Sequence, residues 1–441
     1  MYNRSKILLK MTMMDNITQL EGMRCHKHYF SLPLDYSAPQ GQTIQVFARE
    51  LQGLQPGAQN LPLLLYFQGG PGFAAQRPLA NGGWIKRALQ QYRVLLLDQR
   101  GTGLSSPVSY RTLAGLTAVQ QAQYLSYFRA DNIVRDAEAI RQQLSPQAPW
   151  SVLGQSFGGF CILRYLSVAP EGLQQAFITG GIPSLTRSAD EVYRATYQRV
   201  LSKNREFQRR FPDAPKLLNT LAAHLRQHQE YLPNGDLLTV EMLQLLGIHL
   251  GMMQGPEAVY YLLEQALVSG VNGSTLNPLF AEHFTQMLSY HTNPLYVLLH
   301  EAIYCQQTSS AWAAHRLRAE YPEFSPEADE LLLTGEMVYP WMLQQISNLR
   351  PLQECAELLA SKQDWPTLYN LQQLAANKVP VAAAIYSDDM YVERKFSLET
   401  AAQVANLRYW LTSEYEHNGI RIDGEHILER LIALNNGSQL R

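Results

Sequence analysis

Two short, almost continuous apolar runs constrain the fold of this chain more than any other feature: LPLLLYFQ at 61–68 and YRVLLLDQ at 92–99. Apolar runs of this length without polar alternation are typical of strands that are buried on both faces of a sheet. The segments 131–144 and 157–170 have helical spacing, and 174–181 is again strand-like. Strands separated by helical segments predict a mostly parallel, doubly wound α/β sheet with helices on both faces.

The sequence pattern changes at about residue 186. Between 186 and 372, Leu, Gln, Tyr and Met recur at helical spacing and strand patterns almost vanish. Strand patterns resume at 379–387 and 407–414, before a last helical segment. We therefore predict a core made of residues 1–185 and 373–441, with a large helical cap inserted before the last two strands.

Composition and charge exclude several classes of function. The 441 residues are 46% hydrophobic and carry a net charge of −2, so the chain has no basic footprint for nucleic acid. No apolar run approaches the roughly 18 residues of a membrane span, and the first 16 residues lack the small-residue cleavage site of a signal peptide. The four cysteines are far apart and form no C-x-x-C pair. We expect a cytoplasmic protein with free thiols and no zinc ribbon.

The stretch GQSFG, residues 154–158, places Ser156 between two glycines directly after a predicted strand and before a predicted helix. By chance, G-x-S-x-G arises in roughly one of seven chains of this length, so its context decides its meaning. Strand, G-x-S-x-G and helix in this order form the nucleophile elbow of serine hydrolases. The elbow exposes the serine hydroxyl, and the backbone N–H of Phe157 at the helix start faces a developing oxyanion.

A catalytic serine requires a histidine base and an acid that orients it. In hydrolases with this elbow the acid and then the histidine follow late strands. Asp388 and Asp389 follow the predicted strand at 379–387, and His417 follows the last one. His426 is a rival, but it lies within the predicted final helix, so we predict His417 as the base.

The loop QGGPGFAAQRP, residues 68–78, follows the first apolar strand. In serine hydrolases with this elbow the second oxyanion donor comes from this loop. Its glycines permit backbone paths that are closed to other residues, and Pro71 stiffens it. The chain has no G-x-x-x-x-G-K-[ST] sequence, so we do not interpret this loop as a phosphate-binding loop.

Three stretches together resemble the proline iminopeptidase (prolyl aminopeptidase) family of α/β-hydrolases: GGPG at 69–72, DQRGTGLSSP at 98–107 and GQSFGGF at 154–160. The resemblance covers nearly the whole chain, and the cap is similar to that of the long-form bacterial members. It implies the α/β-hydrolase fold, with Ser156, Asp389 and His417 as the catalytic triad.

The same resemblance implies further site residues. It assigns an oxyanion N–H to Gly70, and the YSDDM stretch matches a Tyr-Asp-Met type of pattern that favours Asp389 over Asp388. Gln68 is a departure, because many members carry histidine before the two glycines. Family members also hold the substrate's free amine with two cap glutamates. Glu301 and Glu336 stand at the matching positions.

Tyr304 and Trp341, near the two glutamates, are candidates for the wall of a proline pocket. HEAIY at 300–304 is not a zinc motif, because its last position is tyrosine rather than histidine. The resemblance thus implies a serine exopeptidase that takes a peptide with a free N-terminal proline and needs no metal or organic cofactor. The sequence implies no particular oligomeric state.

Two alternatives remain open. Fold and triad do not fix a substrate, so an esterase, an amidase or a peptidase of different specificity fits the same residues. A catalytically inactive binding protein is a second alternative, against which the intact triad candidates argue. A haloalkane dehalogenase or epoxide hydrolase is disfavoured, because those enzymes carry aspartate at the elbow.

Overall fold

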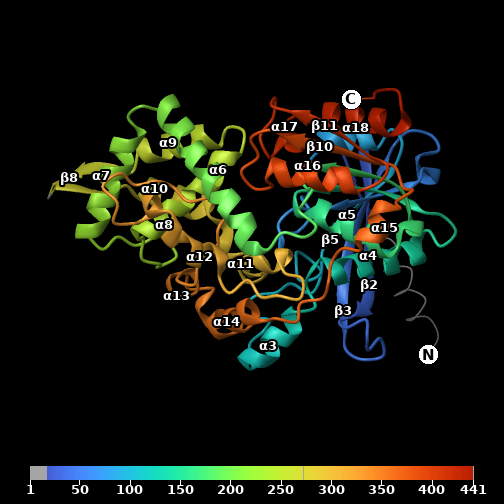
Figure 1. The fold of residues 1–441 in the computed structure, drawn as a ribbon, viewed down its shortest axis with the longest axis horizontal. Coiled ribbons are helices and arrows are strands. Elements are labelled where there is room, and N and C mark those ends of the chain that lie inside the picture. The colour runs from blue at the N-terminus through green and yellow to red at the C-terminus, as the bar shows by residue number, and fades with distance from the viewer. Residues whose placement is uncertain (1–16, 272, 441) are drawn as a thin grey trace, which may run out of the picture.

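A nine-stranded sheet forms the centre of one lobe of the molecule (Figure 1). The computed structural model describes residues 17–271 and 273–440. Residues 1–16, for which we predicted no signal peptide, lie outside the described residues. The sheet has the strand order β1-β2-β3-β5-β4-β6-β7-β10-β11. In chain order the strands are β1 (Ile17–Leu20), β2 (Met23–Pro33), β3 (Thr43–Gly53), β4 (Leu63–Phe67), β5 (Arg93–Asp98), β6 (Trp150–Gln155), β7 (Leu173–Thr179), β10 (Val381–Tyr386) and β11 (Leu407–Thr412).

The strands from β5 to β11 in this order run parallel, whereas β1, β2 and β3 join the sheet edge by antiparallel pairing. Every residue of β4, β6 and β10 is buried, as expected for strands covered on both faces. Side chains alternate between two apolar cores: Leu63 and Leu65 lie in one, and Leu64 and Tyr66 in the other. The predicted α/β-hydrolase fold is confirmed by this sheet.

Helices cover both faces of the sheet. One core contains residues of α4 (Ala130–Leu144), α5 (Phe157–Val168) and α15 (Leu371–Ala375), which lie together in front of the sheet in Figure 1. The other core contains residues of α2 (Gly83–Ala88) and α18 (Gly424–Asn436).

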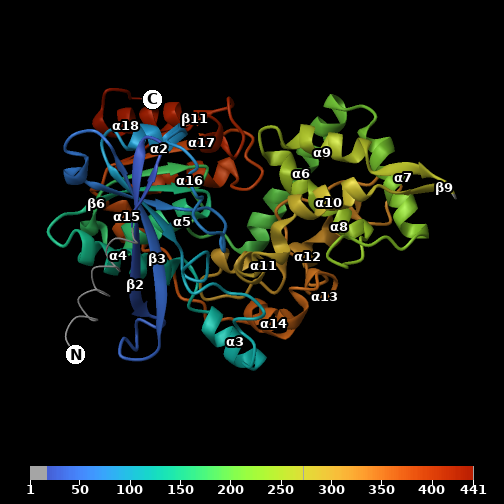
Figure 2. The same ribbon diagram turned by 180° about the vertical axis from the view of Figure 1, so that it is seen from behind.

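A mostly helical second lobe lies beside the sheet in both views (Figures 1 and 2). Its chain leaves the core after β7 and returns before β10. It comprises α6 (Ala189–Arg210), α7 (Ala214–Gln227), α8 (Val240–Gln244), α9 (Gly255–Glu264), α10 (Pro278–Met287), α11 (Pro294–Leu299), α12 (Ala313–Leu317), α13 (Met342–Gln345) and α14 (Gln353–Ser361). The domain limits at 185/186 and 372/373 stay a prediction.

The helical lobe also contains one small antiparallel hairpin, β8 (Leu267–Gly270) and β9 (Gly273–Leu276), which the sequence pattern did not indicate. Conversely, α3 (Ala118–Leu125) comes from the first part of the chain but packs against α14 (Figures 1 and 2). α17 (Gly419–Ile422) lies between β11 and α18.

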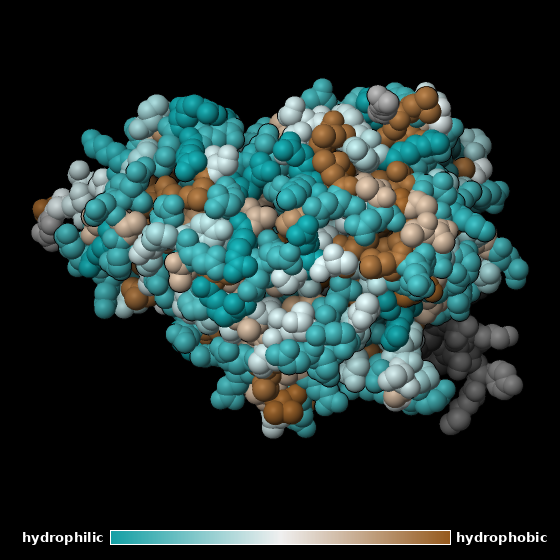
Figure 3. Space-filling model, viewed as in Figure 1, coloured by the Kyte–Doolittle hydropathy of each residue, from teal (hydrophilic) through white to brown (hydrophobic). Residues whose placement is uncertain are grey.

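The face of the molecule drawn in Figure 3 is predominantly hydrophilic, with small separate apolar patches. None of the helices within 17–271 and 273–440 is long and apolar enough to cross a membrane. All four cysteines are buried and unpaired.

Candidate active site

Ser156 lies at the sharp turn between β6 and α5. Its backbone has φ 55° and ψ −124°, a positive φ that a non-glycine residue rarely adopts. A Cβ on Gly154 would lie 2.5 Å from the backbone of Gly158, and one on Gly158 would lie 2.1 Å from the Phe67 carbonyl oxygen. The two glycines therefore let α5 pack directly against β4 and β6. The sequence G-x-S-x-G here forms the turn that a nucleophile elbow requires.

Asp389 and His417 meet at the same end of the sheet, because each follows the carboxyl end of its strand. His417 Nδ1 lies 2.8 Å from Asp389 Oδ2, and both side chains are buried. The other carboxylate oxygen of Asp389 accepts the backbone N–H groups of Tyr391 (2.8 Å) and Val392 (3.0 Å). This carboxylate is held at both oxygens, which fixes the orientation of the imidazole.

The two rivals lie elsewhere. Asp388 is exposed and pairs with Arg199 at 3.2 Å. His426 is exposed on α18, where its ring lies edge-on to Trp410, and it is not among the residues that line the pocket described below. The structure therefore brings Asp389 and His417 together and leaves Asp388 and His426 outside.

Opposing effects act on the pKa of His417. Burial, the largest single effect, lowers this pKa, but the charge of Asp389, the hydrogen bond to it and the charge of Glu336 together outweigh burial, so that the pKa lies above its ordinary value. Glu336 adds to the rise and the positive charge of Arg421 opposes it. An imidazole held in this way accepts a proton readily and is stabilised once it is charged.

The glycine loop after β4 packs against the elbow. A Cβ on Gly69 would lie 2.5 Å from the side chain of Gln155 and 3.0 Å from the Cβ of Ser156. Gly69 and Gly70 line the same pocket as Ser156. Phe157, whose N–H is the other predicted oxyanion donor, is the first residue of α5 and is buried.

Gln68, the departure from the family pattern, helps to fix this loop. In the amide orientation that satisfies both of its ends, the Gln68 side-chain oxygen accepts from the Gly69 N–H at 3.3 Å and from Arg421 Nη2 at 3.2 Å. The side chain thus joins the glycine loop to the segment after His417.

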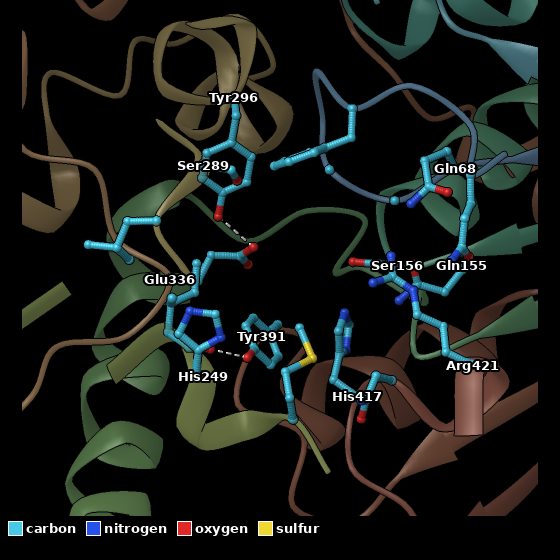
Figure 4. Close-up of a pocket in the computed structure, with 18 of the residues that line it drawn as sticks. Gln68, Gln155, Ser156, His249, Ser289, Tyr296, Glu336, Tyr391, His417 and Arg421 are labelled. Carbon is cyan, nitrogen blue, oxygen red and sulfur yellow. Dashed lines mark hydrogen bonds between the residues drawn. The ribbon is translucent and has the colours of Figure 1, made fainter. Parts of the chain in front are cut away.

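A pocket of about 370 Å³ opens above Ser156 and His417 (Figure 4). The glycine loop and the His417 segment form its floor, and the helical lobe closes the opposite side. The cap side is mainly apolar and aromatic: Ile248, Met252, Met287, Leu288, Tyr290 and Tyr296. The backbone N–H of His417 donates to the Gly251 carbonyl oxygen at 3.2 Å, which links the floor of the pocket to the cap.

Glu336 reaches this pocket from the cap. Its carboxylate accepts a hydrogen bond from the Tyr296 hydroxyl at 2.7 Å and lies 3.8 Å from His300 Nε2. Its side chain is 15% exposed. Burial lowers the pKa of His300, which disfavours the charged imidazolium form beside the carboxylate. Glu336 therefore places a carboxylate at the wall of the pocket.

The other predicted cap residues lie behind the pocket. The Glu301 carboxylate is buried and accepts the backbone N–H groups of Ala313 and Ala314, each at 3.0 Å. Burial raises its pKa. Tyr304 lies against His300 and Phe160, and Trp341 stacks on Tyr339. Glu301, Tyr304 and Trp341 are not among the residues that line the pocket.

Sequence reasoning missed several residues of the pocket. Tyr296, Tyr391 and Arg421 contribute to its walls (Figure 4). Arg421 stands four residues after His417, and Tyr391 two after Asp389. Their closeness in sequence to His417 and Asp389 was the signal that could have identified them. Within the described part of the chain, no group of three His, Cys, Asp or Glu residues is arranged to hold a metal ion.

Comparisons with known proteins identify the family of the chain. The family model of the alpha/beta hydrolase fold matches residues 62–259. The chain is 55% identical to a proline iminopeptidase from Aeromonas sobria over 418 residues, which cover 94% of this chain and 97% of the relative. It is 34% identical to a proline iminopeptidase from Aspergillus aculeatus, with 92% of each chain covered.

The crystal structure of a proline iminopeptidase from Mycobacterium smegmatis aligns at 13% identity with a TM-score of 0.44, covering 93% of this chain and 100% of that one. A likeness of that degree adds nothing to the assignment, which the two sequence relatives carry. An identity of 55% over nearly the full length of both proteins shows common family membership. The chain belongs to the proline iminopeptidase family of α/β-hydrolases.

Proposed function

We propose that this chain releases N-terminal proline from peptides, with Ser156 as nucleophile, His417 as base and Asp389 as the group that orients the base. The observation that carries the proposal is the buried 2.8 Å contact between His417 and Asp389, with His417 and the elbow serine lining one pocket whose cap side holds a carboxylate. The relatives named proline iminopeptidase support the choice of substrate.

The reaction proceeds in two halves. His417 Nε2 takes the proton of Ser156, and the serine oxygen attacks the carbonyl carbon of the N-terminal proline. The N–H groups of Gly70 and Phe157 stabilise the oxyanion. His417 then gives its proton to the leaving amine, the C–N bond breaks, and a prolyl-enzyme ester remains. Water, deprotonated by His417, hydrolyses this ester and restores Ser156.

Glu336 confines the reaction to the N-terminus. The secondary ammonium of an N-terminal proline is positively charged, and Glu336 is the carboxylate among the described residues that line the pocket. The pyrrolidine ring takes the apolar space beside Met252 and Tyr290. We assign the ammonium to Glu336 rather than Glu301, because both oxygens of Glu301 already accept backbone N–H groups.

A panel of aminoacyl naphthylamides tests this proposal. We expect prolyl-naphthylamide to be cleaved with a higher kcat/KM than the alanyl and leucyl compounds, and N-acetyl-prolyl-naphthylamide to be a poor substrate. Ser156→Ala serves as the control for activity that does not come from this site. Equal rates on the free and the acetylated prolyl compounds would refute the exopeptidase assignment, and preferential cleavage of simple esters would favour the esterase alternative.

A further inference from the structure

The pocket contains a cation that the proposed reaction does not use. Arg421, in α17, is the arginine among the described residues that line it, and Ser156 lines the same pocket (Figure 4). Its side chain is exposed to the solvent of the pocket rather than packed in a core.

The charge of Arg421 is not neutralised within the described part of the protein. No carboxylate there forms an ion pair with it, and its hydrogen-bond partner is the neutral amide of Gln68 at 3.2 Å. The carboxylate nearest in sequence, Asp423, accepts a hydrogen bond from the Tyr415 hydroxyl at 2.7 Å instead. The positive charge of Arg421 lowers the pKa of His417, as expected for a cation near the base.

The two opposite charges of the pocket lie on either side of the reacting groups. In Figure 4, Glu336 stands on one side of Ser156 and His417, and Arg421 on the other. If Glu336 holds the substrate's ammonium, the chain that leaves after cleavage extends away from Glu336 and toward Arg421. In a dipeptide, the α-carboxylate is only two bonds from the scissile nitrogen, so it enters this region.

We propose that Arg421 binds the α-carboxylate of the leaving residue, and that it makes the enzyme prefer dipeptides with an N-terminal proline over neutral prolyl substrates. The proposal rests on the function proposed above. A guanidinium suits this task, because its planar fork matches a carboxylate with two parallel hydrogen bonds. The hydrogen bond that Arg421 donates to the Gln68 oxygen orients the fork without neutralising its charge, whereas a carboxylate at position 68 would neutralise it.

Two substrates that differ only in this charge test the proposal: Pro-Ala and its C-terminal amide. We expect the wild-type kcat/KM to be roughly ten-fold higher for the free acid. This ratio corresponds to an interaction energy between those typical of an exposed ion pair and of a hydrogen bond to a charged group. In Arg421→Gln this ratio should fall close to one, and Arg421→Lys should retain part of it. His417 acts on both substrates, so a change in its pKa in the variant affects both kcat/KM values equally and cancels in their ratio.

Arg24→Gln is the matched control. Arg24 is also exposed but lies on β2, away from the pocket, so removal of its charge should leave the ratio at the wild-type value. Added salt should lower the ratio of the wild type and not that of Arg421→Gln, since an exposed pair is screened.

A wild-type ratio near one, or an unchanged ratio in Arg421→Gln, would overturn the inference while prolyl-naphthylamide hydrolysis still upheld the proposed function. A wild type that cleaves no prolyl substrate would overturn both.

Discussion

Replacement of Glu336 by glutamine tests how the enzyme recognises a free N-terminus. The substitution keeps the shape of the side chain and an oxygen for the Tyr296 hydroxyl, now 2.7 Å from the carboxylate, but it removes the negative charge. Loss of one partner of a fully desolvated charge pair costs about 2–5 kcal/mol. The Glu336 side chain is 15% exposed, so we place the loss in the lower part of that range, at about 2–3 kcal/mol.

At 1.36 kcal/mol per decade this corresponds to a fall of about 30- to 150-fold in kcat/KM for prolyl-naphthylamide. The slow hydrolysis of the N-acetyl compound should change little, because that substrate has no ammonium. Steady-state kinetics on both substrates measure the two effects.

Two control variants separate charge recognition from structural damage. Glu323→Gln removes an exposed carboxylate of the same lobe and should leave kcat/KM unchanged. Glu301→Gln places an amide NH2 against backbone N–H groups, so it should lower the melting temperature as well as the activity. A change of less than three-fold in Glu336→Gln, or an equal loss on the acetylated substrate, would refute the role of Glu336.

Three further outcomes follow from the site. His417→Ala should abolish hydrolysis of prolyl-naphthylamide and His426→Ala should not, and a loss in His426→Ala alone would overturn the assignment of the base. The acid limb of kcat/KM should rise with pH through a midpoint above 6.5, because the base acts when neutral and the net effect of its surroundings, with Asp389 as the main raising group, is to raise its pKa. In Asp389→Asn the midpoint should move to lower pH and the rate should fall, whereas an unmoved midpoint would contradict the pairing. Gly158→Ala should lower the melting temperature and the activity, because its Cβ would lie 2.1 Å from the Phe67 oxygen. In the control Gly82→Ala the added Cβ meets nothing within 4 Å, so this variant should be tolerated. Equal melting temperatures of the two variants would show that the elbow does not need the close packing of α5 against β4.

The fold could be predicted because its signals are local. The run at 63–67 is apolar at every position, since both faces of β4 are covered, and the glycines around Ser156 are required by contacts within one strand–turn–helix unit. The hairpin of β8 and β9 was not predicted, because it has no such local signal. Most of its residues are exposed, so no alternation of apolar and polar residues marks it.

The cap residues could not be chosen from the sequence, because their environment depends on distant segments. Glu301 and Glu336 are similar as sequence positions, yet the oxygens of Glu301 are occupied by N–H groups twelve and thirteen residues further on, and Glu336 meets a tyrosine forty residues away. No local pattern distinguishes these two outcomes. Arg421 was overlooked because one exposed arginine carries no motif, and its place in the pocket that Ser156 lines follows from where α17 lies after β11.

The account depends most directly on Ser156 as the nucleophile. Treatment with a fluorophosphonate, followed by peptide mapping, measures which residue is modified and how activity falls with modification. We predict a single adduct on Ser156, loss of prolyl-naphthylamide hydrolysis in proportion to it, and no adduct in Ser156→Ala. Full modification of Ser156 with activity retained would contradict the account.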